Sequence, residues 1–149
     1  MIEAQQEAFD GLIGTYRELN NRVRPLREER LRLDSAEGKS VRDVVQRMRD
    51  DELRFSQALK ERLTGVPMPE IFGDDAPVLG TESEDDSTVV LLSQFGTARE
   101  STLAMLRGVE GDDWTTAIEG GTTIAARIEA LLANDRKRVE QINGLLGAP

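Results

Sequence analysis

Apolar residues recur at intervals of three and four along four separate stretches of the chain, and this spacing constrains the fold more than any other feature. In the first stretch the apolar positions form a single stripe, made of Phe9, Leu12, Tyr16, Leu19, Val23 and Leu26. Such a stripe is typical of an amphipathic helix with one buried side. No stretch shows the strict alternation of a β-strand followed by a hairpin turn. The sequence therefore predicts an all-α fold.

Capping and breaking residues set the expected helix ends. Pro25 lies within the first stripe. Because proline removes a backbone donor, we expect a kink there or a break into a second, short helix. Ser40 is expected to open the next helix, with Asp43 three residues later as its capping partner. The last two main helices are expected to begin at residues 86–87 and 122–123, where hydroxyl or carboxylate side chains can cap them.

A long connection separates the second and third main helices. It runs from about residue 66 to Asp86 and holds three of the five prolines. We interpret it as a surface connection that could cross the other helices, pinned to the core by its apolar residues, Ile71, Phe72, Val78 and Leu79. The prediction is a single domain over residues 1–149, with four main helices around one core and one or two long crossover connections.

Charge and hydropathy exclude two classes of partner. The net charge is −9, and nearly every arginine has an acid within about a turn, so nucleic acid is not an expected partner. No apolar run approaches the roughly 20 residues that a membrane span needs. The first residues lack the basic-then-apolar order of a secretion signal. We therefore expect a cytoplasmic protein that does not enter a membrane.

The chain contains no histidine and no cysteine. These residues hold most transition metals in proteins, and they supply the commonest general base and the strongest soft nucleophile. Their absence excludes most simple enzyme mechanisms, as well as disulfides. No glycine-rich phosphate loop or EF-hand pattern is present either. We expect no cofactor.

Three segments resemble the DinB-like superfamily of four-helix bundles. The residues Gly38-Lys39-Ser40-Val41 look like the Gly-x-Ser-Val motif that opens that family's second helix. Residues 95–106 are similar to its third helix, and residues 123–142 to its last. The resemblance covers residues 9–146 and implies a four-helix bundle of DinB-like type.

The family's metal ligands are replaced in this chain. Metal-binding members carry one histidine on the second helix and two on the fourth, and the matching positions here are Arg47, Asn134 and Arg138. A guanidinium stays protonated and cannot coordinate, and an asparagine amide is a poor lone ligand for a transition metal. The resemblance therefore implies the fold without the metal.

Arg47 and Arg138 can be interpreted in two ways. Left unneutralised, they would form a cationic cleft for a small anionic ligand. Alternatively, nearby acids pair with them in a salt-bridge network, which we favour because a buried charge without a partner costs several kcal/mol. The candidate network residues, chosen by helix face and proximity, are Asp51, Glu52, Arg99 and Asp135. Among them, Glu52 falls on the inward side of its helix by periodicity.

Two functions from different classes remain. The favoured one is a metal-free, non-enzymatic DinB-like protein that serves for dimerisation or for binding an unknown ligand. The alternative, which the resemblance implies, is a thiol-dependent transferase or isomerase, whose thiol cosubstrate would be held by Arg47 and Arg138. The resemblance also implies a homodimer, and the stripe on the first helix is long enough to serve both the core and an interface.

Overall fold

The computed structural model describes residues 2–65, 86–115 and 123–147, and all regular structure in these ranges is helical. The elements in chain order are α1 (Glu3–Val23), α2 (Glu28–Leu31), α3 (Val41–Thr64), α4 (Thr88–Arg107), the 3-10 helix η2 (Gly111–Trp114) and α5 (Ile124–Leu146). For these residues the all-α prediction is confirmed. Within the same ranges, no helix combines the length and apolar character that crossing a membrane requires.

The helix ends follow the local sequence. α1 ends two residues before Pro25, and α2 follows after a short break, as predicted. At the start of α3, the Ser40 hydroxyl accepts from the backbone N–H of Asp43, whose carboxylate accepts from the Ser40 N–H in return. The hydroxyls of Ser87 and Thr123 each accept from one backbone N–H at the start of α4 and α5. Each cap satisfies one backbone donor that the first helical turn leaves unpaired.

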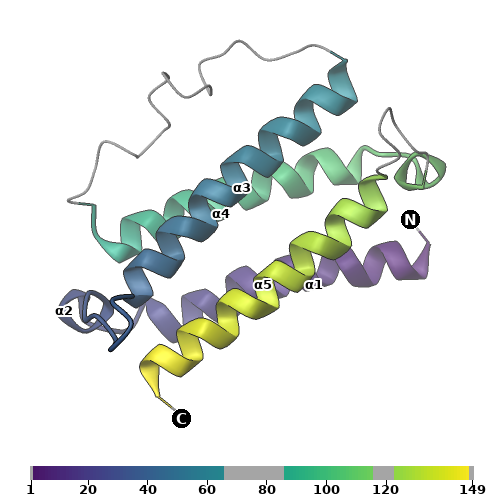
Figure 1. The fold of residues 1–149 in the computed structure, drawn as a ribbon. Coiled ribbons are helices and arrows are strands. Elements are labelled where there is room, and N and C mark those ends of the chain that lie inside the picture. Colours follow the sequence, from purple (N-terminus) through teal and green to yellow (C-terminus); the bar gives the residue numbers. More distant parts are fainter. Residues whose placement is uncertain (1, 66–85, 116–122, 148–149) are drawn as a thin grey trace.

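The four long helices lie in two parallel pairs (Figure 1), α3 beside α4 and α1 beside α5. The direction of α3 and α4 follows from their contacts, because Arg49 meets Gln94 and, further along both helices, Glu52 meets Arg99. The last residue of α3 and the first of α4 therefore lie at opposite ends of the pair. The connection predicted to cross between them, with its expected anchors Ile71, Phe72, Val78 and Leu79, lies outside the described residues.

Two apolar clusters fill the space between the long helices. One is built around Phe95 and Met48, and the other around Trp114 and Leu12. Each long helix contributes residues from one half to the first cluster and from the other half to the second. Between the two halves, each helix carries a buried polar residue. These residues are Thr15 on α1, Glu52 on α3, Arg99 and Thr102 on α4, and Asp135 on α5. The core therefore has a polar layer at its middle.

Most of the apolar stripe of α1 packs into the chain's own core. Phe9, Leu12, Leu19 and Val23 are buried among residues of the same chain, whereas Tyr16 and Leu26 are half-buried. The expectation that the stripe also serves a dimer interface stays a prediction, and only its half-buried residues are still accessible to a second copy.

Candidate functional site

The positions that match the family's metal ligands lie on α3 and α5, and two of them share a groove. Arg47 and Arg138 line a groove of about 380 Å³ between these helices. Asn134 is half-buried on α5, one turn from Arg138, and does not line this groove. The Arg47 side chain is 62% exposed, and the Arg138 side chain is 16% exposed.

Acidic side chains lie close to Arg47 and Arg138 and offset their positive charge. Asp51 lies 3.4 Å from Nε of Arg47 and 4.0 Å from Nη2 of Arg138. Asp43 and Asp50 also line the groove. The sequence interpretation treated both arginines as buried charges, which is wrong for Arg47, because its side of α3 faces solvent. An ion pair that is exposed in this way contributes only about 0–1 kcal/mol.

The side chains at the family's metal position do not fit a metal ion. Arg47 and Arg138 carry no lone pair for coordination, because a guanidinium stays protonated. Asn134 alone offers a weak carbonyl oxygen. Across the described residues, no group of three or more acidic, histidine or cysteine side chains is placed to hold a metal ion.

Three of the buried charged side chains, Arg99, Glu52 and Asp135, meet at the middle of the core instead. Nη1 and Nη2 of Arg99 donate to the two carboxylate oxygens of Asp135, each at 3.0 Å. Nη2 also donates to Oε1 of Glu52 at 2.8 Å. The Arg99 side chain is 1% exposed, and both carboxylates are buried as well. Bidentate pairing of this kind is the strongest arrangement open to an arginine.

Two hydroxyls and a backbone carbonyl complete this group, which we call the Arg99 cluster (Arg99, Glu52, Asp135, Thr15 and Thr102). Thr15 donates to Asp135, and Thr102 donates to Oε2 of Glu52, both at 2.8 Å. Nη1 of Arg99 also donates to the carbonyl oxygen of a residue of α1 at 2.9 Å. The cluster therefore ties all four long helices together at the middle of the core.

The electrostatics of the cluster keep Arg99 charged. Burial alone would lower its pKa, but the nearby carboxylates of Glu52 and Asp135 outweigh burial and raise the pKa above its ordinary value. The guanidinium also lies over the ring of Phe95, with its central carbon 5.0 Å from the ring centre. Arg99 therefore cannot serve as a base, and its Nη hydrogens are already occupied by acceptors.

The sequence located part of this cluster. The prediction that Glu52 faces inward is confirmed. Glu52 and Asp135, however, pair with Arg99 rather than with the two arginines at the family's metal position. Thr15 was not predicted to take part, although its position between Leu12 and Leu19 places it on the buried stripe, where a hydroxyl needs a partner.

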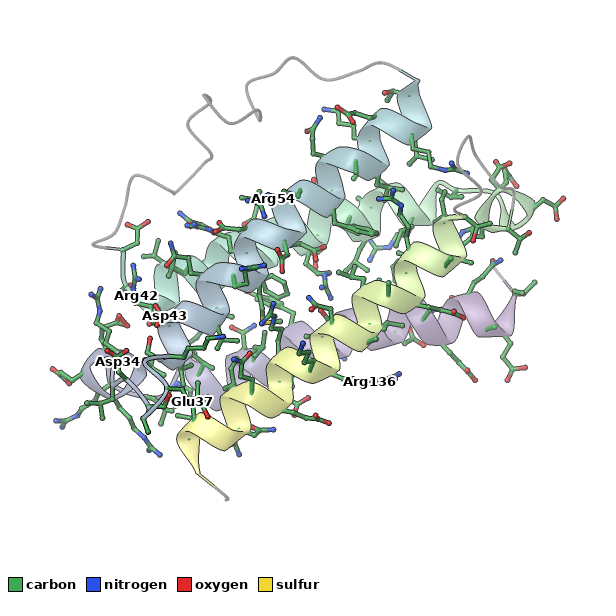
Figure 2. The ribbon with its side chains drawn as sticks, in the orientation of Figure 1. Asp34, Glu37, Arg42, Asp43, Arg54 and Arg136 are labelled. Carbon is green, nitrogen blue, oxygen red and sulfur yellow. The ribbon has the colours of Figure 1, made fainter. Side chains whose placement is uncertain are left out.

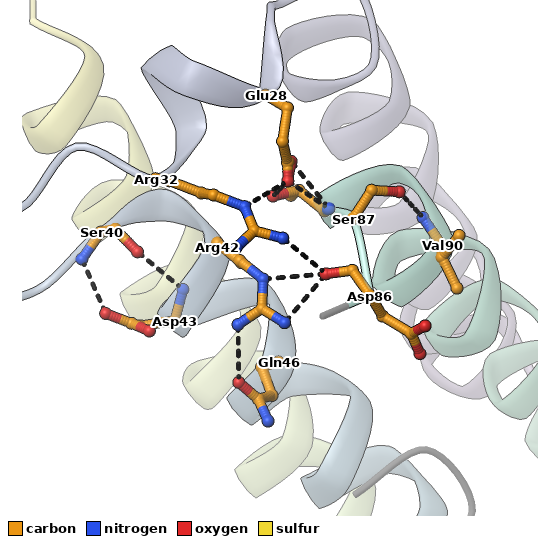
Figure 3. Close-up of polar contacts among 10 residues, drawn as sticks. Glu28, Arg32, Ser40, Arg42, Asp43, Gln46, Asp86, Ser87 and Val90 are labelled. Carbon is orange, nitrogen blue, oxygen red and sulfur yellow. Dashed lines mark hydrogen bonds and ion pairs between the residues drawn. The ribbon is translucent and has the colours of Figure 1, made fainter. Parts of the chain in front are cut away.

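A second polar group, not anticipated from the sequence, fixes the start of α4 (Figure 3). Arg42 donates through Nε and Nη2 to the backbone oxygen of Asp86, at 3.0 and 2.9 Å, and Arg32 donates to the same oxygen. The Glu28 carboxylate accepts from the backbone N–H of Thr88 at 2.8 Å. Burial opposes ionisation of Glu28, but hydrogen bonds from Thr88 and Arg32 outweigh it and lower its pKa. These bonds join α2, α3 and α4 at one corner.

A third feature is an uncharged groove of about 490 Å³ between α3 and α4. Its lining combines aliphatic side chains with hydroxyls and amides, and none of these residues carries a charge. They are Leu53, Ser56, Gln57, Val89, Val90, Ser93, Gln94, Thr97, Ala98 and Ser101. Val90 is 41% exposed at its edge. The groove offers apolar contact and neutral hydrogen bonds, but no group suited to catalysis.

Comparison with known proteins found no match. No protein-family model matches the chain, and no curated protein or solved structure matches it. Its function is therefore inferred from its own residues.

Proposed function

We propose that the chain is a metal-free helical bundle of DinB-like type that acts without catalysis, as a binding module. The order of its elements supports this proposal. A first long helix that breaks before Pro25, a second opened by Gly38-Lys39-Ser40-Val41, and a parallel third helix agree with the segments that resemble the family.

The observation that carries the proposal is the closure of the Arg99 cluster. A catalytic site needs at least one base, nucleophile or electrophilic donor that a substrate can reach. Here the buried carboxylates already accept from Arg99, Thr15 and Thr102, and the cluster is buried between two apolar layers. The titratable groups of the Arg99 cluster thus serve to hold the helices together. Binding by this module would therefore take place at its surface.

The alternative function, a thiol-dependent transferase, needs Arg47 and Arg138 to hold an anionic cosubstrate. Asp51 lies against both arginines, and Asp43 and Asp50 line the same groove. An anion entering there would meet these carboxylates at close range, and like charges repel. The charge balance of the groove therefore favours the non-catalytic function.

Thermal unfolding with and without added anion tests the choice. For the non-catalytic module, phosphate or a small carboxylic acid leaves the melting temperature of the parent unchanged beyond a general salt effect, since a specific ligand raises it only by binding the folded state. Arg136→Ala is the matched control, because Arg136 lies exposed on the outer side of α5 (Figure 2). A phosphate-dependent rise that disappears in Arg47→Ala and Arg138→Ala, but persists in the control, would establish the anion cleft.

Elemental analysis provides a second test of the same proposal. Protein purified without an affinity tag should contain well below one equivalent of zinc, nickel, iron or manganese, because neither guanidinium at the family's metal position can coordinate. A stoichiometric metal that resists chelators would contradict the proposal and direct attention to carboxylates such as Glu52.

A further inference from the structure

The uncharged groove between α3 and α4 differs in composition from the rest of the molecule. The chain contains 32% charged residues, yet none of the ten residues that line this groove is charged. On α4, Arg99 is buried in its cluster, and neither Glu100 nor Arg107 lines the groove. On α3, the exposed Arg54 reaches Asp51, 3.8 Å away, instead of the groove. The groove is therefore a neutral strip on a highly charged molecule.

The groove is long and narrow. Its lining on α4 runs from Val89 to Ser101, a length of about 18 Å at 1.5 Å per residue. A volume of about 490 Å³ spread over this length leaves a width of about 5–6 Å. A helix with its side chains is about 10–12 Å across and does not fit within this width. A single aliphatic chain does fit, because non-bonded carbon atoms approach one another to about 3.5–4.0 Å.

Aliphatic side chains line the groove along its length. Val89 and Val90 lie near the start of α4, Ala98 lies further along the same helix, and Leu53 lies on α3. Such side chains bind the hydrocarbon part of a ligand by removing it from water. Sites for small molecules have volumes of about 300–1,000 Å³ and mostly apolar linings with a few polar groups, as this groove has.

Two hydroxyls at one end of the groove have no protein partner. Ser56 on α3 and Ser101 on α4 both line the groove, and neither side chain forms a hydrogen bond among the described residues. The Thr97 hydroxyl, by contrast, donates to a backbone carbonyl at 3.1 Å. Thr102 bonds Glu52, one turn before Ser56, so the two free hydroxyls lie at the same end. Each can donate to and accept from a neutral polar group.

A charged ligand does not suit this lining. An ionic group that enters the groove loses hydration and meets no opposite charge in return, which costs far more than burying a neutral polar group. An anion is also repelled by the net charge of −9. The absence of charge therefore selects an uncharged ligand.

We propose that the groove binds an uncharged, elongated small molecule, whose aliphatic chain lies along the groove and whose hydroxyl-bearing end meets Ser56 and Ser101. Long-chain alcohols and monoacylglycerols belong to this class. The proposal rests on the proposed function, because it names the class of ligand that the binding module takes.

The pair of 1-octanol and octanoate tests the class of ligand, because the two probes share an aliphatic chain and differ in charge. In NMR titrations of the isotope-labelled protein, 1-octanol should produce saturable shifts at groove amides such as Ser56, Val90 and Ser101. A dissociation constant on the order of 1 mM is expected for a molecule of this size. Octanoate should bind there at least about tenfold more weakly. Each methylene removed from the alcohol should weaken binding about two- to fourfold.

Substitutions of Thr97, an exposed residue of the lining, test the location of the site. Thr97→Glu should weaken 1-octanol binding at least about tenfold, because it places a charge in the groove. Ala133→Glu is the matched control, at an exposed position of α5, and should leave binding unchanged. Thr97→Lys should reverse the preference, so that octanoate binds more tightly than 1-octanol. Circular dichroism checks that all three variants keep the parent's helix content.

Removal of the two free hydroxyls tests the orientation of the ligand. The double variant with Ser56→Ala and Ser101→Ala keeps the aliphatic lining and removes the hydrogen-bonding groups at one end. It should weaken 1-octanol binding about two- to tenfold, as expected for the loss of a neutral hydrogen bond.

Four results would overturn the proposal. One is a parent that does not bind 1-octanol saturably in this groove, which would leave the groove to another part of this chain or to a protein partner. The others are octanoate binding there as tightly as 1-octanol, equal effects of Thr97→Glu and Ala133→Glu, and unchanged affinity in the double serine variant. None of them depends on metal content or on phosphate-induced stabilisation, so failure of this proposal is distinguishable from failure of the proposed function.

Discussion

Removing the guanidinium of Arg99 should be among the most damaging single substitutions in this protein. Arg99→Met keeps the apolar stem and leaves Glu52 and Asp135 buried without their cation. Three hydrogen bonds of 2.8–3.0 Å between Arg99 and the two carboxylates are lost. Such bonds contribute about 1.5–3 kcal/mol each, but measured contributions do not add, and breaking one side of a buried ion pair costs about 3–5 kcal/mol in total.

We therefore expect Arg99→Met to lower the free energy of unfolding by about 4 kcal/mol, out of about 5–15 kcal/mol for a typical domain. For a chain of this length, the melting temperature should fall by about 8–16 °C. Urea and thermal denaturation at pH 7 measure both quantities. Arg136→Met is the matched control and should change stability by less than about 0.5 kcal/mol, because its side chain is exposed.

Two further variants separate ion pairing from simple packing. Combining Arg99→Met with Glu52→Gln and Asp135→Asn removes all three charges and should recover part of the loss, because neutral side chains cost less to bury than unpaired carboxylates. A loss for Arg99→Met no larger than that of Arg136→Met would refute the assignment of a buried ion cluster.

Three smaller effects follow from other contacts. Glu28→Gln should make the stability of the protein depend less on pH in acid. Folding lowers the pKa of Glu28, so its carboxylate stabilises the protein above an unfolded-state pKa of about 4.3, and this contribution is lost as the pH falls through the lower folded-state pKa. An unchanged dependence of the melting temperature on acid pH would contradict this. Arg47→Ala should cost less than about 1 kcal/mol, because the pair that it breaks is exposed; urea titration would expose a larger loss. Gly96→Ala should destabilise by about 1–3 kcal/mol, because the new methyl group would overlap the ring of Tyr16. Gly144→Ala is the control, because a methyl group there has no atom within 4 Å, and it should stabilise the protein by about 0.5–1 kcal/mol. Equal melting curves for the two alanine variants would disprove the close approach of Gly96 to Tyr16.

Local rules allowed the helix boundaries to be predicted closely. The break before Pro25, the paired caps of Ser40 and Asp43, and the cap at Thr123 depend only on residues within a few positions of one another. A proline removes its own hydrogen bond and a cap satisfies the nearest free amide, whatever the rest of the chain does. These features are therefore visible in the sequence alone.

The candidate site was predicted less well, because its partners come from different helices. Periodicity placed Glu52 inward, but it could not choose between Arg47, Arg138 and Arg99 as the cation that meets it. That choice depends on the angle and register with which α3, α4 and α5 pack, and these are set by the fit of the apolar side chains above and below the polar layer. Thr15 was missed for the same reason.

The sequence by itself determined that this protein is helical, where most of its helices begin and end, and that it contains neither histidine nor cysteine. The tertiary structure alone decided which charges are buried together. Glu52, Arg99 and Asp135 lie on three different helices, and only the packing of those helices brings them within hydrogen-bond distance. Helix formation is governed by neighbours along the chain, but burial is governed by neighbours in space.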